Sequence, residues 1–124
     1  MTESSTIQHQ AASFVPTSKV AVVFVRPETV LDDVERVMRM ADYHETLIKT
    51  AATLLKINIS WQHYYPGCTT TPWQLDGVIT ALKNIVHTDL TSVHNGTVVV
   101  NPREGAENNK HTVVERKHQL TSVF

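Results

Sequence analysis

The sequence of 124 residues is poor in cysteine and glycine, with one cysteine, Cys68, and four glycines. A single cysteine can form neither an internal disulfide nor a cysteine cluster for zinc or an iron–sulfur centre. The chain also lacks a nucleophile elbow, a P-loop and a glycine-rich dinucleotide turn. Its seven histidines are scattered, without the spacing of a helical metal site. We therefore expect no metal and no cofactor in this chain, and an iron–sulfur cluster would belong to a longer parent protein.

The chain also lacks an excess of either charge and a long apolar run. Eleven basic and twelve acidic residues give a net charge of -1, and like charges form no run. Such a balance indicates neither a surface that binds the phosphate backbone of nucleic acid nor an acidic tail. No apolar stretch approaches the roughly 18 residues of a membrane helix, and the first ten residues lack the regions of a secretion signal. We expect no nucleic-acid or membrane partner and a cytoplasmic location.

What is present suits one globular domain, since 41% of the residues are hydrophobic. Residues 1–18 are mostly polar and predict a flexible N-terminal tail, and residues 19–124 predict a single domain. The β-branched run KVAVVFV, residues 19–25, predicts a strand buried on both faces. Residues 52–59 and 89–96 predict two further strands. Residues 97–100 either continue the last of these after a bulge or form a separate extended piece.

Helical patterns separate these strands. Residues 29–41 have apolar side chains at helical spacing, and Thr29 with Asp32 resembles a capping box. Residues 43–50 predict a short helical turn, and residues 105–118 a weak helix. A helix from residue 72 begins with Thr71 as its N-cap and Pro72 at its first position. The final residues, TSVF, predict the beginning of another strand.

This alternation of strands and helices predicts an α/β fold with a small parallel, or mostly parallel, sheet and helices on its faces. Three strands make a small sheet, and the sequence ends on the first residues of another one. We therefore expect an incomplete portion of a larger α/β domain, a fragment truncated at its C-terminal side.

Polar residues at the carboxyl end of the second predicted strand indicate a site. Alternation along the strand places Lys56 and Asn58 on one face, about 6.6 Å apart. Ligands of parallel α/β folds gather at this edge of the sheet, and the next helix starts there with unpaired amides and a positive dipole. We predict a phosphate or carboxylate pocket, without identified catalytic residues, that is formed by Lys56, Asn58, Thr69, Thr70, Thr71, His94 and Asn95.

Plainer interpretations of the same residues stay open. Lys56 can be an edge lysine with its stem on the surface, and Asn58 can simply end the strand. Thr71 can serve only as a helix cap, and His94 as a structural donor. The loop after the second strand carries aromatic residues that either line a ligand site or cover the sheet edge: Trp61, Tyr64 and Tyr65.

The order of KVAVVFV, LLKINIS, GCTTTPWQLDGVITALKN and DLTSVHNG resembles the amino-terminal part of the family catalogued as domain of unknown function 362, over about residues 19–96. In that family a lysine, a variable residue and an asparagine end a strand before a threonine-rich turn and a helix. The matching positions are Lys56, Asn58, Thr69, Thr70 and Pro72. The chain differs at Ile57 and Val86, where the family usually has proline and glycine. Some family members look like iron–sulfur proteins with ferredoxin-like cysteines, which this chain lacks.

Two classes of function follow. The first is an anion-binding site that takes part in catalysis only within a longer chain. The second is a non-catalytic interaction module that binds another protein or a redox partner through the aromatic loop. Self-association through a truncated sheet edge is a further expectation of the second class.

Overall fold

The computed structural model describes residues 18–85 and 89–124. Its elements, in chain order, are α1 (Val30–Met40), α2 (Tyr43–Thr46), β1 (Thr53–Lys56), α3 (Pro72–Asn84), β2 (Leu90–Val93), α4 (Pro102–Asn108), α5 (His111–His118) and β3 (Thr121–Val123). The predicted tail, except for its last residue, and the position of Val86 lie outside the described residues.

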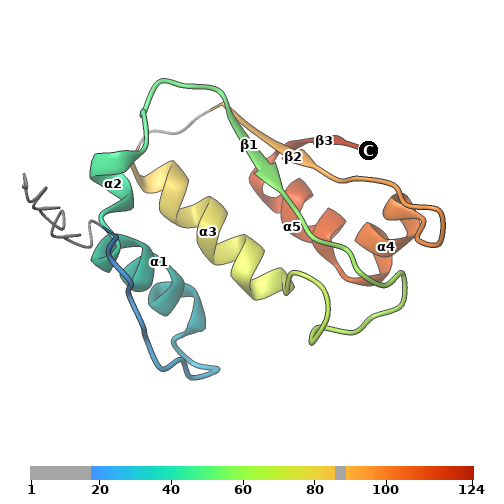
Figure 1. Ribbon diagram of the computed structural model, residues 1–124, viewed down its shortest axis with the longest axis horizontal. Helices are drawn as coiled ribbons and strands as arrows, with labels where there is room; N and C mark the ends of the chain where they lie inside the picture. Colours follow the sequence, from blue (N-terminus) through green and yellow to red (C-terminus); the bar gives the residue numbers. More distant parts are fainter. Residues whose placement is uncertain (1–17, 86–88) are drawn as a thin grey trace, which may run out of the picture.

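The α/β class and the parallel sheet are confirmed (Figure 1). The strand order is β1-β2-β3, with Thr53 opposite Leu90 and Thr91 opposite Thr121. Helix α3 connects β1 to β2, and helices α4 and α5 connect β2 to β3. Each connection is therefore the crossover that parallel neighbours require.

The core lies between the sheet and the long helices. Helix α1 packs against α3, and α3 packs against α5. Along β1, Leu55 and Ile57 point inward, whereas Leu54, with 69% of its surface exposed, and Lys56 point outward. The buried apolar side chains of this cluster come from five parts of the chain: Tyr43, Ile57, Leu75, Ile79, Ala81, Leu82, Leu90 and Val114.

The prediction of a buried strand over residues 19–25 is wrong. The segment forms no strand, and the side chains of Val20, Val22 and Phe24 are 84%, 69% and 94% exposed. It runs on the side of α1 away from the sheet (Figure 1), and the ammonium group of Lys19 pairs with the Asp42 carboxylate. A strand requires a neighbour that pairs with its backbone, and no strand within residues 18–85 and 89–124 pairs with residues 19–25 in this position.

Two local predictions near the helix ends are also wrong. Thr29 precedes α1, but its hydroxyl donates to the Asp33 carboxylate at 2.6 Å and caps no backbone amide. Residues 97–100 form a turn instead of extended chain, because the Thr97 amide donates to the Val100 carbonyl at 3.4 Å and the Val100 amide to the Thr97 hydroxyl at 3.1 Å.

The single helix predicted over residues 105–118 is in fact two helices. Helix α4 begins earlier, after Asn101, whose side-chain oxygen accepts hydrogen bonds from the amides of Arg103 and Glu104. The helices are separated at Lys110, whose φ of 67° is left-handed. That conformation ends a right-handed helix, so α5 starts in a new direction.

Candidate functional site

Lys56 ends β1 at the edge of the sheet from which α3 begins. Its ammonium group donates one hydrogen bond, at 3.1 Å, to the carbonyl of the adjacent Ile57. No carboxylate in residues 18–85 and 89–124 forms an ion pair with Lys56. The positive charge of Lys56 is therefore solvated and not neutralised by the fold.

A hollow of about 250 Å³ opens beside Lys56, between β1 and the first turns of α3. Among the described residues that line it, Lys56 is the one that is charged, and Thr70 and Gln74 are polar. The rest of the lining is aliphatic and consists of Leu54, Leu55, Ile57, Leu75 and Val78. The hollow therefore combines one cation and two hydrogen-bonding side chains with an apolar wall.

Asn58 and Thr70 are joined by one backbone–backbone hydrogen bond and one from a backbone amide to a side-chain hydroxyl. The Thr70 amide donates to the Asn58 carbonyl at 3.0 Å, and the Asn58 amide donates to the Thr70 hydroxyl oxygen at 3.2 Å. The side-chain amide of Asn58 donates to the Ser60 hydroxyl at 2.9 Å and to the Cys68 carbonyl at 3.4 Å. Asn58 thus holds the loop that leads to Thr70, and the Thr70 hydroxyl keeps its own proton for donation.

The other two predicted threonines have structural partners. Thr71 is the N-cap of α3, as predicted, and its hydroxyl accepts a hydrogen bond from the Gln74 amide at 3.3 Å. Thr69 is buried, and its hydroxyl lies 3.1 Å from the side-chain oxygen of Asn109 and 3.2 Å from the Tyr65 carbonyl. These threonines shape the turn before α3 and do not present their hydroxyls at the hollow.

His94 follows β2 and is buried, away from the hollow. Its Nε2 lies 2.9 Å from the Glu115 carboxylate, which also accepts a hydrogen bond from the Ser92 hydroxyl at 2.6 Å. Burial alone would raise the pKa of Glu115, but the hydrogen bonds from His94, Ser92 and Ser122 lower it to about 2. Asn95, the next predicted residue, is exposed.

The sequence could not indicate this group, because Glu115, Ser92 and Ser122 belong to three different elements, α5, β2 and β3. The Ser92 hydroxyl lies 3.0 Å from that of Ser122, so the network connects neighbouring strands with the helix that covers them. Ser92 is completely buried, and no ligand can reach its hydroxyl without a rearrangement of this core. The group is therefore a structural network and not a nucleophile with its base.

His111 is a second buried histidine that the sequence analysis did not single out. Its Nε2 lies 2.6 Å from the Thr70 carbonyl oxygen, which can only accept, so Nε2 carries the proton. The Nδ1 atoms of His111 and His94 are buried without a described hydrogen-bond partner, and the two rings stack with centroids 6.2 Å apart. Burial lowers the pKa of His111, although the hydrogen bond to Thr70 opposes this change.

The aromatic loop after β1 surrounds an open hollow of about 530 Å³. Trp61, Tyr64 and Tyr65 are 50%, 54% and 61% exposed, and the Tyr65 amide donates to the Asn109 side-chain oxygen at 3.1 Å. The complete lining is Ser60, Trp61, His63, Tyr64, Tyr65 and Cys68. The loop therefore presents partly exposed aromatic surface.

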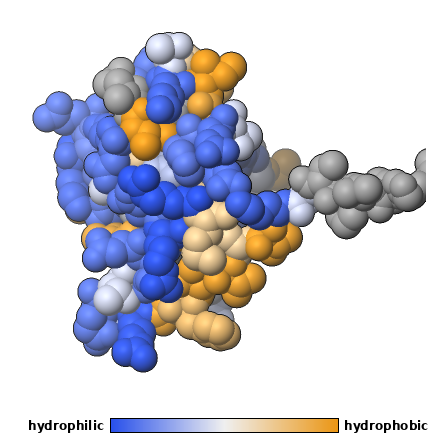
Figure 2. All heavy atoms as spheres, turned by 90° about the vertical axis from the view of Figure 1, so that its left-hand side faces the viewer, coloured by the Kyte–Doolittle hydropathy of each residue, from blue (hydrophilic) through white to orange (hydrophobic). Residues whose placement is uncertain are grey.

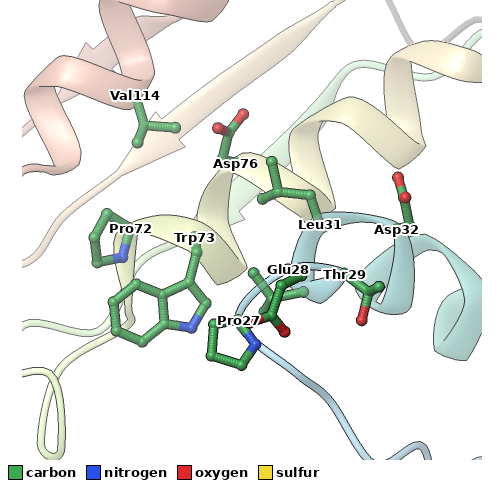
Figure 3. A pocket seen from close by; sticks show the side chains of 10 residues that line it. Pro27, Glu28, Thr29, Leu31, Asp32, Pro72, Trp73, Asp76 and Val114 are labelled. Atoms are coloured by element: carbon green, nitrogen blue, oxygen red, sulfur yellow. The ribbon is translucent and has the colours of Figure 1, made fainter.

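A further hollow, of about 510 Å³, lies where the first turns of α1 and α3 approach α5 (Figure 3). Trp73, Pro27 and Pro72 line its apolar side, and its carboxylates include that of Asp76. Asp76 already binds Lys117 and His118; burial alone would raise its pKa, but these two partners lower it. The sequence could not indicate this hollow, because it exists only after α1 has packed on α3.

No group of three or more histidine, cysteine or acidic side chains in the described part of the chain could hold a metal ion. None of the helices described above is long and apolar enough to cross a membrane. Comparisons with protein-family models, with curated proteins and with solved structures find no match to this chain. Any function must therefore be argued from the geometry of these residues.

Proposed function

We propose that this chain binds a small carboxylate in the hollow beside Lys56. The observation that carries the proposal is the charge of Lys56, which has no ion-pair partner among the described residues and lines a hollow with no other charged residue. An anion placed there would gain a charge-assisted hydrogen bond. The Thr70 hydroxyl and the Gln74 side-chain amide are the groups that would orient it.

The lining favours a carboxylate with a short hydrocarbon part over inorganic phosphate. The wall is mainly aliphatic, and burying the hydrocarbon part of a ligand against it is favourable. The hollow, at about 250 Å³, is slightly smaller than the roughly 300–1,000 Å³ of drug-sized ligand sites. A short aliphatic acid such as butyrate therefore matches both the charge and the size.

Asn58 supports this site without contacting the ligand, because its side chain holds the loop before Thr70. Participation of the site in catalysis, within a longer chain, stays a prediction. Membership of the domain of unknown function 362 family is likewise our proposal and rests on the order of the motifs over residues 19–96. An iron–sulfur cluster would lie outside this chain.

Ligand-induced stabilisation in thermal unfolding tests the proposal, with butyrate, acetate and inorganic phosphate as probes. A ligand at 100 times its dissociation constant stabilises the folded state by about 2.7 kcal/mol. Loss of a charge-assisted hydrogen bond of about 1.5–3 kcal/mol in Lys56→Met should weaken butyrate binding roughly ten- to a hundredfold. Lys49→Met is the matched control, because Lys49 is also exposed but does not line the hollow. Equal stabilisation of all three proteins, or of none, contradicts the proposal.

The exposed aromatic loop favours a second candidate, a non-catalytic module that associates with another protein chain. Its hollow presents Trp61 and Tyr64, residue types that are enriched at the centres of protein interfaces. For self-association the test is size-exclusion chromatography over a range of concentrations. A complex that Trp61→Ser dissociates and that Val98→Ser, at another exposed apolar residue, leaves intact supports this candidate. A monomer at all concentrations, together with saturable butyrate binding, favours the first.

A further inference from the structure

Strand β1 borders the sheet and pairs with β2 on one side only. The amides of Thr53 and Ile57 donate toward β2, to the carbonyls of Asp89 at 2.9 Å and Val93 at 3.0 Å. Successive residues of a strand direct their backbone groups to opposite sides, so residues 54 and 56 direct theirs to the outer edge. Residue 58 has the same parity and is already paired with residue 70 on that side. As far as the described part of the chain goes, the open part of the outer edge therefore spans residues 54 to 56.

The chain also contains a strand-like segment whose backbone pairs with no strand of the described residues. Residues 19–25 have the composition of a buried strand, yet Val20, Val22 and Phe24 are mostly exposed. Figure 2, which shows this side of the molecule, has apolar side chains gathered on part of a largely hydrophilic face. An exposed segment of this kind is an unfavourable arrangement in water, because it leaves both apolar surface and backbone groups without partners inside the protein.

The chain direction fits this segment to the open edge. Residues 19–25 and β1 run in the same direction, and α1 and α3 both run in the opposite direction (Figure 1). Helix α1 already lies against α3, with Val34 beside Gly77. The segment, α1 and β1 thus have the connectivity of the units β1-α3-β2 and β2-α5-β3. A right-handed crossover with its helix next to α3 would place the first strand at the outer edge of β1.

We propose that residues 19–25 dock on the outer edge of β1 as a fourth parallel strand of the same chain. The backbone groups of residues 54 and 56 are the partners, and the apolar side chains of the segment become covered by the sheet and α1. The hinge is the turn closed by the Thr29 amide and the Arg26 carbonyl, at 3.1 Å. Docking breaks the exposed ion pair between Lys19 and Asp42, a contact of the kind that contributes little to stability.

Disulfide trapping tests the docked strand in a Cys68→Ser background. Leu54→Cys is combined in turn with a cysteine at each position from 20 to 25, under mild oxidation. Neighbouring strands lie about 4.7–4.9 Å apart, within the range that a disulfide spans. Because strand side chains alternate, we expect Leu54→Cys to form disulfides within one molecule at every second position of the segment. These disulfides should form about tenfold faster than those of the control pairs. The control replaces Leu54→Cys by Val113→Cys, at an exposed residue on α5.

Three outcomes overturn the proposal: no disulfide at any position, equal rates at all six, or disulfides only between two molecules. The last would assign the edge to a second copy of the chain. Hydrogen exchange provides a second test that needs no cysteine. The amides of residues 54 and 56 should exchange slowly, and either Val22→Pro or Val23→Pro should accelerate them, because proline removes a donor from the pairing. If the amides of residues 54 and 56 exchange at the wild-type rate in both proline variants, the proposal of a docked strand is also overturned.

The docked strand and the carboxylate site are adjacent on β1, since residues 54 to 57 also line the hollow, but they use different groups. The strand uses the backbone edge of β1, whereas the ligand uses the ammonium group of Lys56. Lys56→Met in the trapping background should therefore leave the disulfide pattern unchanged while it weakens the response to butyrate. A lost disulfide pattern with an intact butyrate response contradicts the strand alone, and the reverse result contradicts the ligand site alone.

Discussion

The imidazole Nε2 of His111 lies 2.6 Å from the carbonyl oxygen of Thr70 and connects the first turn of α5 to the turn before α3. Thr70 in turn pairs through its backbone with Asn58, immediately after β1. A buried histidine thereby positions the polar end of the proposed carboxylate site. Its ring also stacks with that of His94, which is bound to Glu115. The stability of this buried group and the shape of the hollow are therefore coupled.

Glu115→Gln should destabilise the protein strongly. The carboxylate is 3% exposed and is bound by Ser92 and His94, so its loss leaves buried partners with unsatisfied or mismatched hydrogen bonds. Each hydrogen bond to a charged group such as this carboxylate contributes about 1.5–3 kcal/mol. Urea unfolding measures the change. Glu107→Gln is the control: its ion pair with Arg116 is exposed, and we expect less than about 1 kcal/mol.

Stability should fall as the pH decreases below about 6.5, because of His111. Burial lowers the pKa of His111 in the folded state, so the unfolded chain binds more protons in this range. The contribution is complete above the unfolded-state pKa and is lost as the pH falls toward the lower folded-state value. Urea unfolding between pH 8 and 5 measures the free energy of unfolding at each pH. This free energy should change less with pH in His111→Gln than in the wild type. His63→Gln is the control, because His63 is exposed. If the free energy of unfolding changes with pH as steeply in His111→Gln as in the wild type, His111 is not the cause.

A separate loss of stability should occur at lower pH, through Glu115. Its pKa is lowered from 4.5 to about 2 in the folded state, so the unfolded chain takes up the proton first. The stabilisation by the ionised Glu115 carboxylate is complete above pH 4.5 and disappears between pH 4.5 and about 2. Thermal unfolding of the wild type and of Glu115→Gln from pH 6 to 3 measures it. The two melting temperatures should approach each other as the pH falls, and a constant difference would count against this explanation.

Gly77→Ala should destabilise the contact between α1 and α3. A Cβ at this position would lie 2.7 Å from the Cβ of Val34, which is backbone-fixed and cannot rotate away. We expect a loss of about 1–3 kcal/mol, despite the better helix propensity of alanine. Gly67→Ala is the control, since its nearest neighbour would be 3.8 Å away. In a double-mutant cycle, Val34→Gly, which removes this Cβ, should recover part of the loss; purely additive effects would show that the contact is not the cause.

Thr71→Ala should lower stability without changing ligand binding. The Thr71 hydroxyl accepts the hydrogen bond from the Gln74 amide, and removal of such an N-cap costs about 1 kcal/mol. Because this hydroxyl does not line the hollow, the shift in melting temperature caused by butyrate should stay the same. Loss of that shift in Thr71→Ala, with normal folding by circular dichroism, would mean that the threonine contacts the ligand.

Features that depend on neighbouring residues of the chain could be predicted from the sequence. The start of α3 is an example, because its cap is formed by Thr71, Pro72 and an amide only three residues further on. The parallel sheet could also be predicted, since the alternation of strands and helices restricts the connections that are sterically accessible. The exposed Lys56 and the inward Ile57 follow from the period of two along a strand.

The tertiary structure decided two features: the position of residues 19–25 and the hydrogen-bond partners of His94. The apolar run has a strand's composition, but composition does not determine whether another strand pairs with it. Similarly, Glu115 is 21 residues from His94, and only the packing of α5 on the sheet brings their side chains to 2.9 Å. The sequence alone therefore determined helices α1 and α3, the faces of β1 and the fold class, through short-range hydrogen bonds and periodic burial. The tertiary structure decided the buried network and the open edge of β1, because both depend on contacts between residues far apart in the chain.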